Sequence, residues 1–165
     1  MKSTIKVATI LTWFNLIVWG GLLGLMLLLG LAMANMPMII AVFLFSAIPL
    51  HSYAALKLQK SIRHPQVKLS HQTPVGVRFI GFVALFFGIC TIANASMIIT
   101  DPKTMLKSME AGIAETKGLS ESEMARVMQI ASGFFILMGA TVILNVIMNL
   151  RLLRWYYLVK RSDVS

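Results

Sequence analysis

Three stretches of this chain run for more than twenty residues without one Lys, Arg, Asp or Glu. They cover residues 7–56, 79–100 and 127–150. An α-helix needs about 20 predominantly apolar residues to cross the hydrocarbon core of a bilayer. The first stretch is long enough for two such helices, and each of the others is long enough for one. The sequence therefore predicts an all-α membrane protein with four transmembrane helices in an antiparallel bundle.

The composition supports the membrane class and indicates which kind of binding partner to expect. Only 13% of the residues are charged, whereas a soluble domain has about 25%. In a soluble protein, the net charge of +9 would suggest a nucleic-acid partner. Here the basic residues flank apolar stretches, so we expect a bilayer with anionic headgroups as the partner and no nucleic acid. The single cysteine excludes an intramolecular disulfide framework.

The first stretch divides at Asn35-Met36-Pro37. Asn is a favoured helix cap, and Pro is tolerated in a first turn, where its missing N–H needs no partner. We expect one helix over about 6–33 and a second from residue 36 onward. Because the connection is so short, the two helices are expected to form an antiparallel hairpin.

A cleaved signal peptide is the competing interpretation of the first helix. The Ala32-Met33-Ala34 sequence fits the small-residue pattern of a cleavage site. However, a signal h-region contains only about 7–15 apolar residues, and the apolar run here is far longer. We therefore expect the segment to be retained in a single four-span domain over 1–165. The expected spans are about 7–33, 37–58, 76–100 and 125–150.

Two prolines predict a kink inside the second helix and a boundary at its end. Pro49 removes a backbone hydrogen bond to the carbonyl of Phe45 inside the second helix, and Ser46 is expected to help satisfy that oxygen. His64 precedes Pro65, and a residue before Pro disfavours helical geometry, so the second helix should stop there. A cytoplasmic loop is expected over 59–75.

The third and fourth spans have start signals of their own. Thr73-Pro74 is expected to be the N-cap and first turn of the third helix. An outer segment over 101–124 follows that helix, and its Met105, Met109 and Ile113 recur at helical spacing. This pattern predicts a short amphipathic helix on the membrane surface. The Ser120-Glu121-Ser122-Glu123 capping box then predicts the start of the fourth helix.

The charge distribution predicts the orientation. The N-terminus, the segment 57–78 and the basic C-terminal tail 151–165 together hold eleven bases and one acid. The 101–126 segment holds four bases and five acids. The positive-inside rule therefore predicts that both termini are cytoplasmic, in the plasma (inner) membrane. Lipid headgroups are expected to contact the bases nearest the spans: Lys57, Lys60, Arg63, Arg78, Arg151, Arg154, Lys160 and Arg161.

The spans contain little that suggests chemistry. No Asp, Glu, Lys or Arg lies inside them, whereas proton-coupled carriers usually keep such a group in the membrane. His51 is expected to be an interfacial histidine beyond the kink, bonded to headgroup, water or a neighbouring helix. His64 and His71 are expected to be solvated loop residues, and Cys90 to be a packing residue. We expect no catalytic residue, no metal site and no cofactor.

Uncharged polar residues are the main candidates within the spans, and several alternatives stay open for them. A hydrogen bond between Asn15 and Asn145 would link the first and fourth helices and contribute about 0.6–2 kcal/mol. Asn94, with Thr91 and Ser96, would either hold helices together or line a polar path. The full set of polar intramembrane candidates is Asn15, Asn94, Thr91, Ser96, Asn145 and His51.

Small residues suggest close helix packing. Gly20 and Gly24 form a G-x-x-x-G pattern, and Ala84 and Gly88 repeat the small-residue spacing in the third span. Such residues let helix backbones approach closely, within one chain or between copies.

These observations favour a small membrane protein that acts without catalysis, through helix packing and assembly. A scaffold, an accessory subunit or a homo-oligomer would all fit, with a second copy or another membrane protein as partner. The alternative is a channel or carrier for a small or uncharged solute, built around Asn94, Thr91 and Ser96. A second alternative is an intramembrane enzyme that uses His51 or Cys90.

Overall fold

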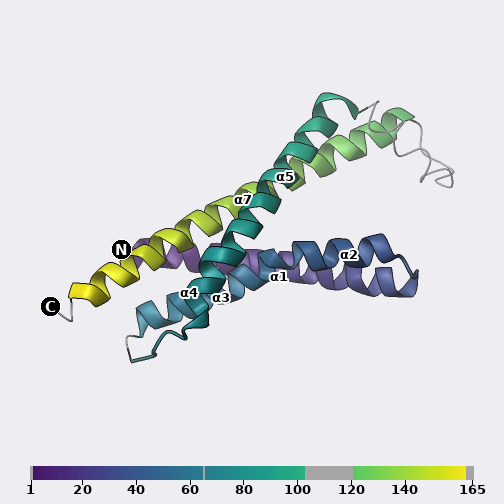
Figure 1. Cartoon of the computed structure of the whole chain (residues 1–165). Coiled ribbons are helices and arrows are strands. Elements are labelled where there is room, and N and C mark those ends of the chain that lie inside the picture. Colours follow the sequence, from purple (N-terminus) through teal and green to yellow (C-terminus); the bar gives the residue numbers. More distant parts are fainter. Residues whose placement is uncertain (1, 65, 103–120, 163–165) are drawn as a thin grey trace. The chain divides into compact units, whose positions relative to one another are not determined.

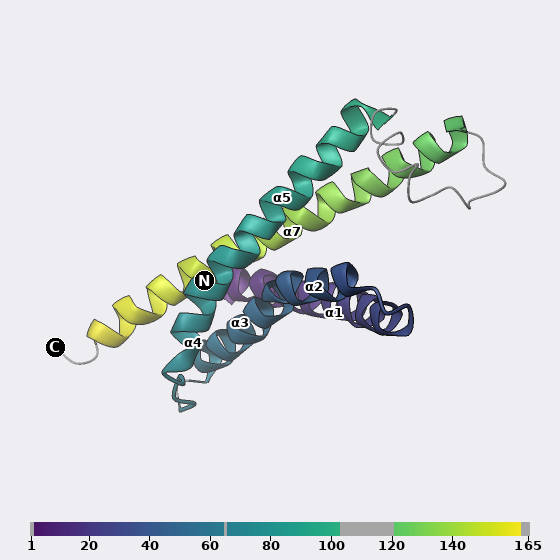
Figure 2. The same ribbon diagram turned by 45° about the vertical axis from the view of Figure 1, so that its right-hand side comes forward.

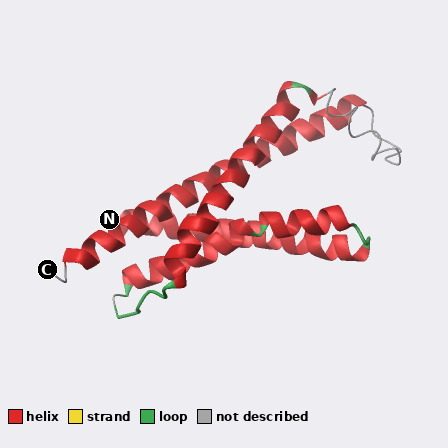
Figure 3. Ribbon diagram, viewed as in Figure 1, coloured by secondary structure: helices red, strands yellow, loops and turns green. Residues whose placement is uncertain are grey.

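The computed structural model describes residues 2–64, 66–102 and 121–162. Within these ranges every regular element is a helix (Figure 3). In chain order (Figure 1), the elements are α1 (Lys2–Ala32), α2 (Met36–Phe45), α3 (Ala47–Arg63), α4 (Gln72–Val75), the π-helical turn η1 (Gly76–Ile80), α5 (Gly81–Thr100) and α7 (Glu121–Ser162).

Four continuous helical stretches among the described residues are long and apolar enough to cross a membrane. Two of them are composites, since α2 joins α3 and α4 leads through η1 into α5. The prediction of four membrane-length helices is confirmed. The stretches are Ser3–Ala32, Met36–Arg63, Gln72–Thr100 and Ser122–Val159.

The chain divides into two compact units. The first unit contains Met1–Phe87 and Thr141–Ser165, and the second unit contains Gly88–Ala140. The helices α5 and α7 therefore contribute one end to each unit.

A tight turn in the first unit reverses the chain at the predicted position. The Asn35 side chain caps α2 by accepting a hydrogen bond from the Met38 N–H at 3.0 Å. Asn35 N–H donates to Gly30 O, and Ala34 N–H donates to Leu31 O. This pair of bonds is a Schellman motif, which requires a left-handed residue after the helix. Ala34 takes that conformation, with φ +49°, and α2 returns alongside α1 (Figures 1 and 2).

The second long helix is interrupted at Ser46, in the turn that precedes Pro49. The Ser46 hydroxyl donates to the carbonyl of Phe43 at 2.6 Å, so the prediction that it satisfies the Phe45 carbonyl is wrong. The hydroxyl reaches back three residues within its own turn, as Ser side chains commonly do in helices. The stop was predicted correctly, since α3 ends at Arg63 and His64 is non-helical.

The third long helix begins two residues earlier than predicted. Gln72 is the first residue of α4, and His71 occupies the N-cap without a side-chain bond. Thr73 is therefore inside the helix, where it is buried, and it is not the cap. Close packing follows, because a Cβ on Gly76 would lie 3.1 Å from the Ala54 Cβ of α3.

The last helix, α7, runs from Glu121 to Ser162 and so extends well past the predicted span. Residues 151–162, predicted to be a basic tail, continue the helix. The predicted surface helix lies almost wholly outside the described residues, as does Ser120 of the capping box. The preceding helix, α5, ends at Thr100, immediately before Asp101, as predicted.

Aromatic and aliphatic contacts hold the first unit together. Trp19 of α1 stacks on Phe45 of α2, with ring centroids 6.1 Å apart, and Phe45 contacts Phe87 of α5 at 4.9 Å. An apolar cluster from α1, α3, η1 and α7 packs further along the unit, and it consists of Ala8, Ala54, Leu58, Val77, Leu152 and Leu153.

Candidate functional site: a buried polar network

Three helices of the first unit place polar side chains against one another. All six of these side chains are at most 2% exposed. On each helix the two residues are separated by three, seven or four positions, spacings that put both on one face. They are Thr12 and Asn15 of α1, Ser52 and Gln59 of α3, and Asn145 and Asn149 of α7.

Hydrogen bonds join five of these side chains into one network. Thr12 Oγ1 lies 2.7 Å from Asn145 Oδ1, and Gln59 Nε2 donates to Asn149 Oδ1 at 2.7 Å. Asn149 Nδ2 also donates to Asn145 Oδ1 at 2.9 Å. Asn145 Nδ2 reaches Ser52 Oγ at 3.3 Å. The network therefore ties α1, α3 and α7 together through neutral amides and hydroxyls.

Thr12 is the junction of the network. Its oxygen accepts from Gln59 Nε2 at 3.0 Å and from Asn149 Nδ2 at 3.3 Å. As a donor it has two acceptors within reach, Asn145 Oδ1 and the Ala8 carbonyl at 2.6 Å. A hydroxyl carries one proton, so Thr12 donates to only one of these acceptors at a time.

The direct bond suggested between Asn15 and Asn145 is not formed. Asn15 instead pairs with Thr141, donating to its carbonyl at 3.3 Å and accepting from its hydroxyl at 3.3 Å. Asn145 pairs with Thr12, one turn away from Asn15 along α1. Both asparagines therefore link α1 to α7, but the register of the two helices offsets their partners by about one turn.

Sequence reasoning missed four members of the network: Thr12, Ser52, Gln59 and Asn149. Gln59 was placed in the cytoplasmic segment 59–75, whereas the structure buries its side chain against α1 and α7. The helical spacing of Ser52 with Gln59 and of Asn145 with Asn149 was the available signal. One atom of the network stays unsatisfied, because Gln59 Oε1 is buried and has no hydrogen-bond partner among the described residues.

His51 lies between helices, not at an interface with headgroups or water. The side chain is 1% exposed. A Cβ on Gly81 of α5 would stand 2.9 Å from its Nδ1 and 3.5 Å from Val146 of α7, so the ring occupies the space that Gly81 leaves open. The Val77 backbone approaches the ring. Neither ring nitrogen, however, forms a hydrogen bond of acceptable geometry with the described residues.

The polar candidates of the second unit are arranged differently. Asn94 is exposed on α5, whereas Thr91 and Ser96 are half-buried. The Asn94 side chain makes no hydrogen bond within the described part of the chain. By contrast, the exposed Thr100 hydroxyl bonds to the Ser96 carbonyl of its own helix at 2.9 Å.

Several predicted headgroup contacts have partners within the first unit. Arg63 donates to Thr9 Oγ1, Lys57 lies over the Tyr53 ring at 4.5 Å, and Arg78 lies over the Tyr157 ring at 5.5 Å. Lys60, Arg151 and Arg154 are exposed. The side chains of Lys160 and Arg161 lie outside the described part.

The two small-residue patterns differ in how closely other atoms approach their glycines. A Cβ on Gly20, Gly21 or Gly24 would meet nothing within 4 Å. A Cβ on Gly139 would instead meet the Gly88 carbonyl oxygen in the second unit. The second pattern, and not the first, therefore marks a close approach between helices of the chain.

The titratable and metal-binding residue types are dispersed in the structure. No group of three His, Cys, Asp or Glu side chains comes together among the described residues, and Cys90 is half-buried. The polar network itself offers only neutral donors and acceptors, whose established use in packed helices is to hold them together. No family model, curated protein or solved structure matches the chain.

Proposed function

We propose that the protein is an integral membrane protein that acts without catalysis, by assembling with further copies of itself. The observation that carries this proposal is the exposed Asn94 on a helix long and apolar enough to cross a membrane. An amide in hydrocarbon loses its hydrogen bonds to water, so it favours a helix–helix contact that restores them.

The surroundings of Asn94 suit such a contact. Exposed Met97 follows three residues later, and half-buried Cys90 precedes by four, so both lie on the same side of α5. An exposed apolar stripe with helical spacing runs beside them. Its members are Phe79, Phe82, Phe86, Ile89 and Met97.

A second copy is the simplest partner for this amide. An asparagine side chain is both donor and acceptor, so two copies of Asn94 can satisfy each other. The amides of the first unit are already bonded within the chain, through Asn15, Asn145 and Asn149. Asn94 is therefore the asparagine of the membrane-length helices whose hydrogen-bonding capacity is left for another molecule.

The test is the mass of the purified protein in mild detergent and in lipid nanodiscs, measured by light scattering. We expect the wild type to exceed one chain and Asn94→Leu to shift toward the monomer. Thr100→Val is the matched control, because its hydroxyl is exposed on the same helix but is satisfied internally. A strictly monomeric wild type contradicts the proposal. One chain bound to a different protein would replace it with an accessory-subunit role.

The channel or carrier alternative places the same residue on a conducting path. Proteoliposomes separate the two functions, since assembly alone predicts no solute flux. Solute flux that is lost in Asn94→Leu would show that the assembly forms a pore and is not only structural. Flux that is unchanged in Asn94→Leu would remove this residue from any path.

The proposed orientation places both termini in the cytoplasm, in the plasma (inner) membrane. The support is the basic N-terminus, segment 57–78 and C-terminal end, against the mixed-charge 101–126 segment. In a Cys90→Ser background, a membrane-impermeant maleimide should label Met36→Cys in intact cells and leave Ser70→Cys unlabelled. Both sites are exposed, so the reverse pattern would overturn the orientation. The same orientation brings the basic residues to anionic headgroups.

A further inference from the structure

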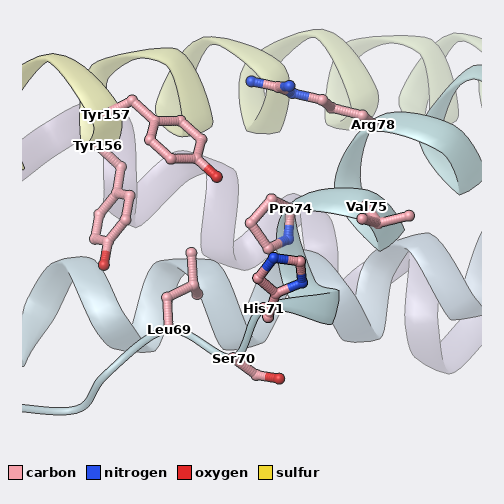
Figure 4. Close-up of a pocket in the computed structure, with 8 residues that line it drawn as sticks. All are labelled: Leu69, Ser70, His71, Pro74, Val75, Arg78, Tyr156 and Tyr157. Atoms are coloured by element: carbon pink, nitrogen blue, oxygen red, sulfur yellow. The ribbon is translucent and has the colours of Figure 1, made fainter.

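Arg78 and Tyr157 line both of two hollows in the first unit. The first hollow, of about 320 Å³, lies between the chain segment before α4 and the end of α7 (Figure 4). Leu69, Ser70 and His71 line one side of it, and Tyr156 and Tyr157 line the other. The second hollow, of about 570 Å³, is lined by Arg78, Leu150, Leu153, Arg154, Tyr157 and Leu158.

Among the described residues of the first unit, the positive charge around these hollows is not matched by any carboxylate side chain. The chain contains no Asp or Glu in 1–100 or in 141–162, the ranges that supply every described residue of the first unit. Arg78 and Arg154 both line the second hollow. Two guanidinium groups at one cavity repel each other unless an anion lies between them. No described residue of this unit carries a carboxylate side chain that could supply this anion, so the charge favours an anionic ligand.

The contact of Arg78 with the Tyr157 ring orients the guanidinium for such an anion. The guanidinium carbon lies 5.5 Å from the ring centroid, which is a cation–π distance. The Arg78 side chain forms no hydrogen bond with the described residues, so its N–H donors remain available for two-point contact with a phosphate. The side chain is thereby oriented before any ligand binds, which lowers the entropic cost of binding.

The remaining lining distinguishes a lipid from a free anion. Leu150, Leu153 and Leu158 give the second hollow an apolar wall beside its two arginines. Leu150, Arg154 and Leu158 follow each other at intervals of four on α7, so they form one continuous strip. A free phosphate gains nothing from leucines, whereas a phospholipid places its phosphate and its acyl chain side by side.

We infer that Arg78, Arg154 and Tyr157 form a binding site for the phosphate of an anionic phospholipid, whose acyl chain runs from the phosphate past Leu150 toward the bilayer core. The tyrosine hydroxyl and the exposed His71 at the first hollow can contact the rest of the headgroup. The inference rests on the headgroup contact proposed above, and it selects one site from a broadly basic surface. It is independent of assembly through Asn94.

The experiment measures lipid binding to the full chain in detergent by native mass spectrometry. The probes are dioleoyl phosphatidylglycerol, dioleoyl phosphatidylcholine and inorganic phosphate. We expect one phosphatidylglycerol to bind more tightly than phosphatidylcholine. Arg78→Gln and Arg154→Gln should each weaken that binding about tenfold, the effect of losing one charge-assisted hydrogen bond. Lys57→Gln is the matched control, since Lys57 also lies over a tyrosine but lines neither hollow.

The outcomes separate the site from general attraction to anionic lipid. Equal weakening in Lys57→Gln and Arg78→Gln would overturn the site and leave the headgroup proposal standing. Absence of any phosphatidylglycerol preference in the wild type would overturn both. Competition by inorganic phosphate with the same dependence on Arg78 would show that a free anion is the ligand and would overturn the lipid assignment. Thermal unfolding in phosphatidylcholine confirms that each variant is folded.

Discussion

A Cβ placed on Gly139 would lie 2.9 Å from the backbone carbonyl oxygen of Gly88, closer than real Cβ contacts come. The same Cβ would lie 2.7 Å from the Cγ1 of Ile92. The two glycines belong to α7 and α5, and both lie in the second unit. Only the absence of a side chain at residue 139 permits this approach of the two helices.

Gly139→Ala should destabilise the protein. The carbonyl of Gly88 is part of a helix and cannot rotate away, so the helices must separate, at a cost of about 1–3 kcal/mol for overpacking. Gly133→Ala is the control on the same helix, because its Cβ would meet nothing within 4 Å. The control should be neutral or slightly stabilising, since Ala favours helix over Gly by about 1 kcal/mol. Thermal unfolding in detergent compares the two, and equal midpoints would contradict the close contact.

Gly81→Ala should also destabilise, for a reason that a second substitution can remove. The new Cβ would stand 2.9 Å from Nδ1 of His51, a ring that is buried between helices and cannot swing into solvent. We expect a loss of about 1–3 kcal/mol from this overpacking. In a His51→Ala background the added methyl fills space instead, so Gly81→Ala should be much less harmful there. Additive unfolding free energies in the double variant would show that the two side chains do not compete for this space.

Local chemistry explains what could be predicted from the sequence. The four membrane-length helices follow from the lengths of the uncharged stretches. The turn at Asn35 and the stop before Pro65 depend on a cap and on a proline, and both act within a few residues of themselves. The wrong prediction of an N-cap at Thr73 has a cause that is not local. A threonine before Pro suits an N-cap, but packing buries this one inside α4.

The polar network could be predicted only in part, because its pairs depend on helix register. Asn15 and Asn145 were recognised as interhelical residues, but a shift of one turn gives each a different partner. Gln59 was missed because the basic residues around it placed this part of the helix in the cytoplasmic segment, outside the bilayer. Lys60, the next residue of the same helix, is exposed, whereas Gln59 is buried. A buried and an exposed face can alternate within one turn of a helix, so local charge does not show which face a residue occupies.

Ala34→Gly should stabilise the turn between α1 and α2. Ala34 occupies the left-handed position of the Schellman motif with φ +49°. A Cβ in that conformation costs about 1–2 kcal/mol, and glycine avoids most of this cost. Part of the gain is offset, because glycine has more conformational entropy in the unfolded chain. The unfolding midpoint should therefore rise modestly in Ala34→Gly and fall in Ala34→Val, and a fall in both would contradict the left-handed geometry.

The bond between Gln59 and Asn149 provides the most direct test of the polar network. Gln59→Leu leaves Asn149 Oδ1 without its 2.7 Å donor, and Asn149→Leu leaves Gln59 Nε2 without that acceptor. Each single variant should therefore be destabilised, because a buried polar group is left unsatisfied at a cost of about 1–3 kcal/mol. The double variant removes both groups together, so its loss should be smaller than the sum. We expect a coupling free energy of about 0.6–1.7 kcal/mol in a double-mutant cycle, the range found between membrane helices.

Gln59→Leu combined with Thr100→Val supplies the control cycle, since the Thr100 hydroxyl bonds to the Ser96 carbonyl and shares no partner with Gln59. In this control cycle the two changes in unfolding free energy should add. If the changes also add in the Gln59–Asn149 cycle, the two side chains do not hold α3 against α7.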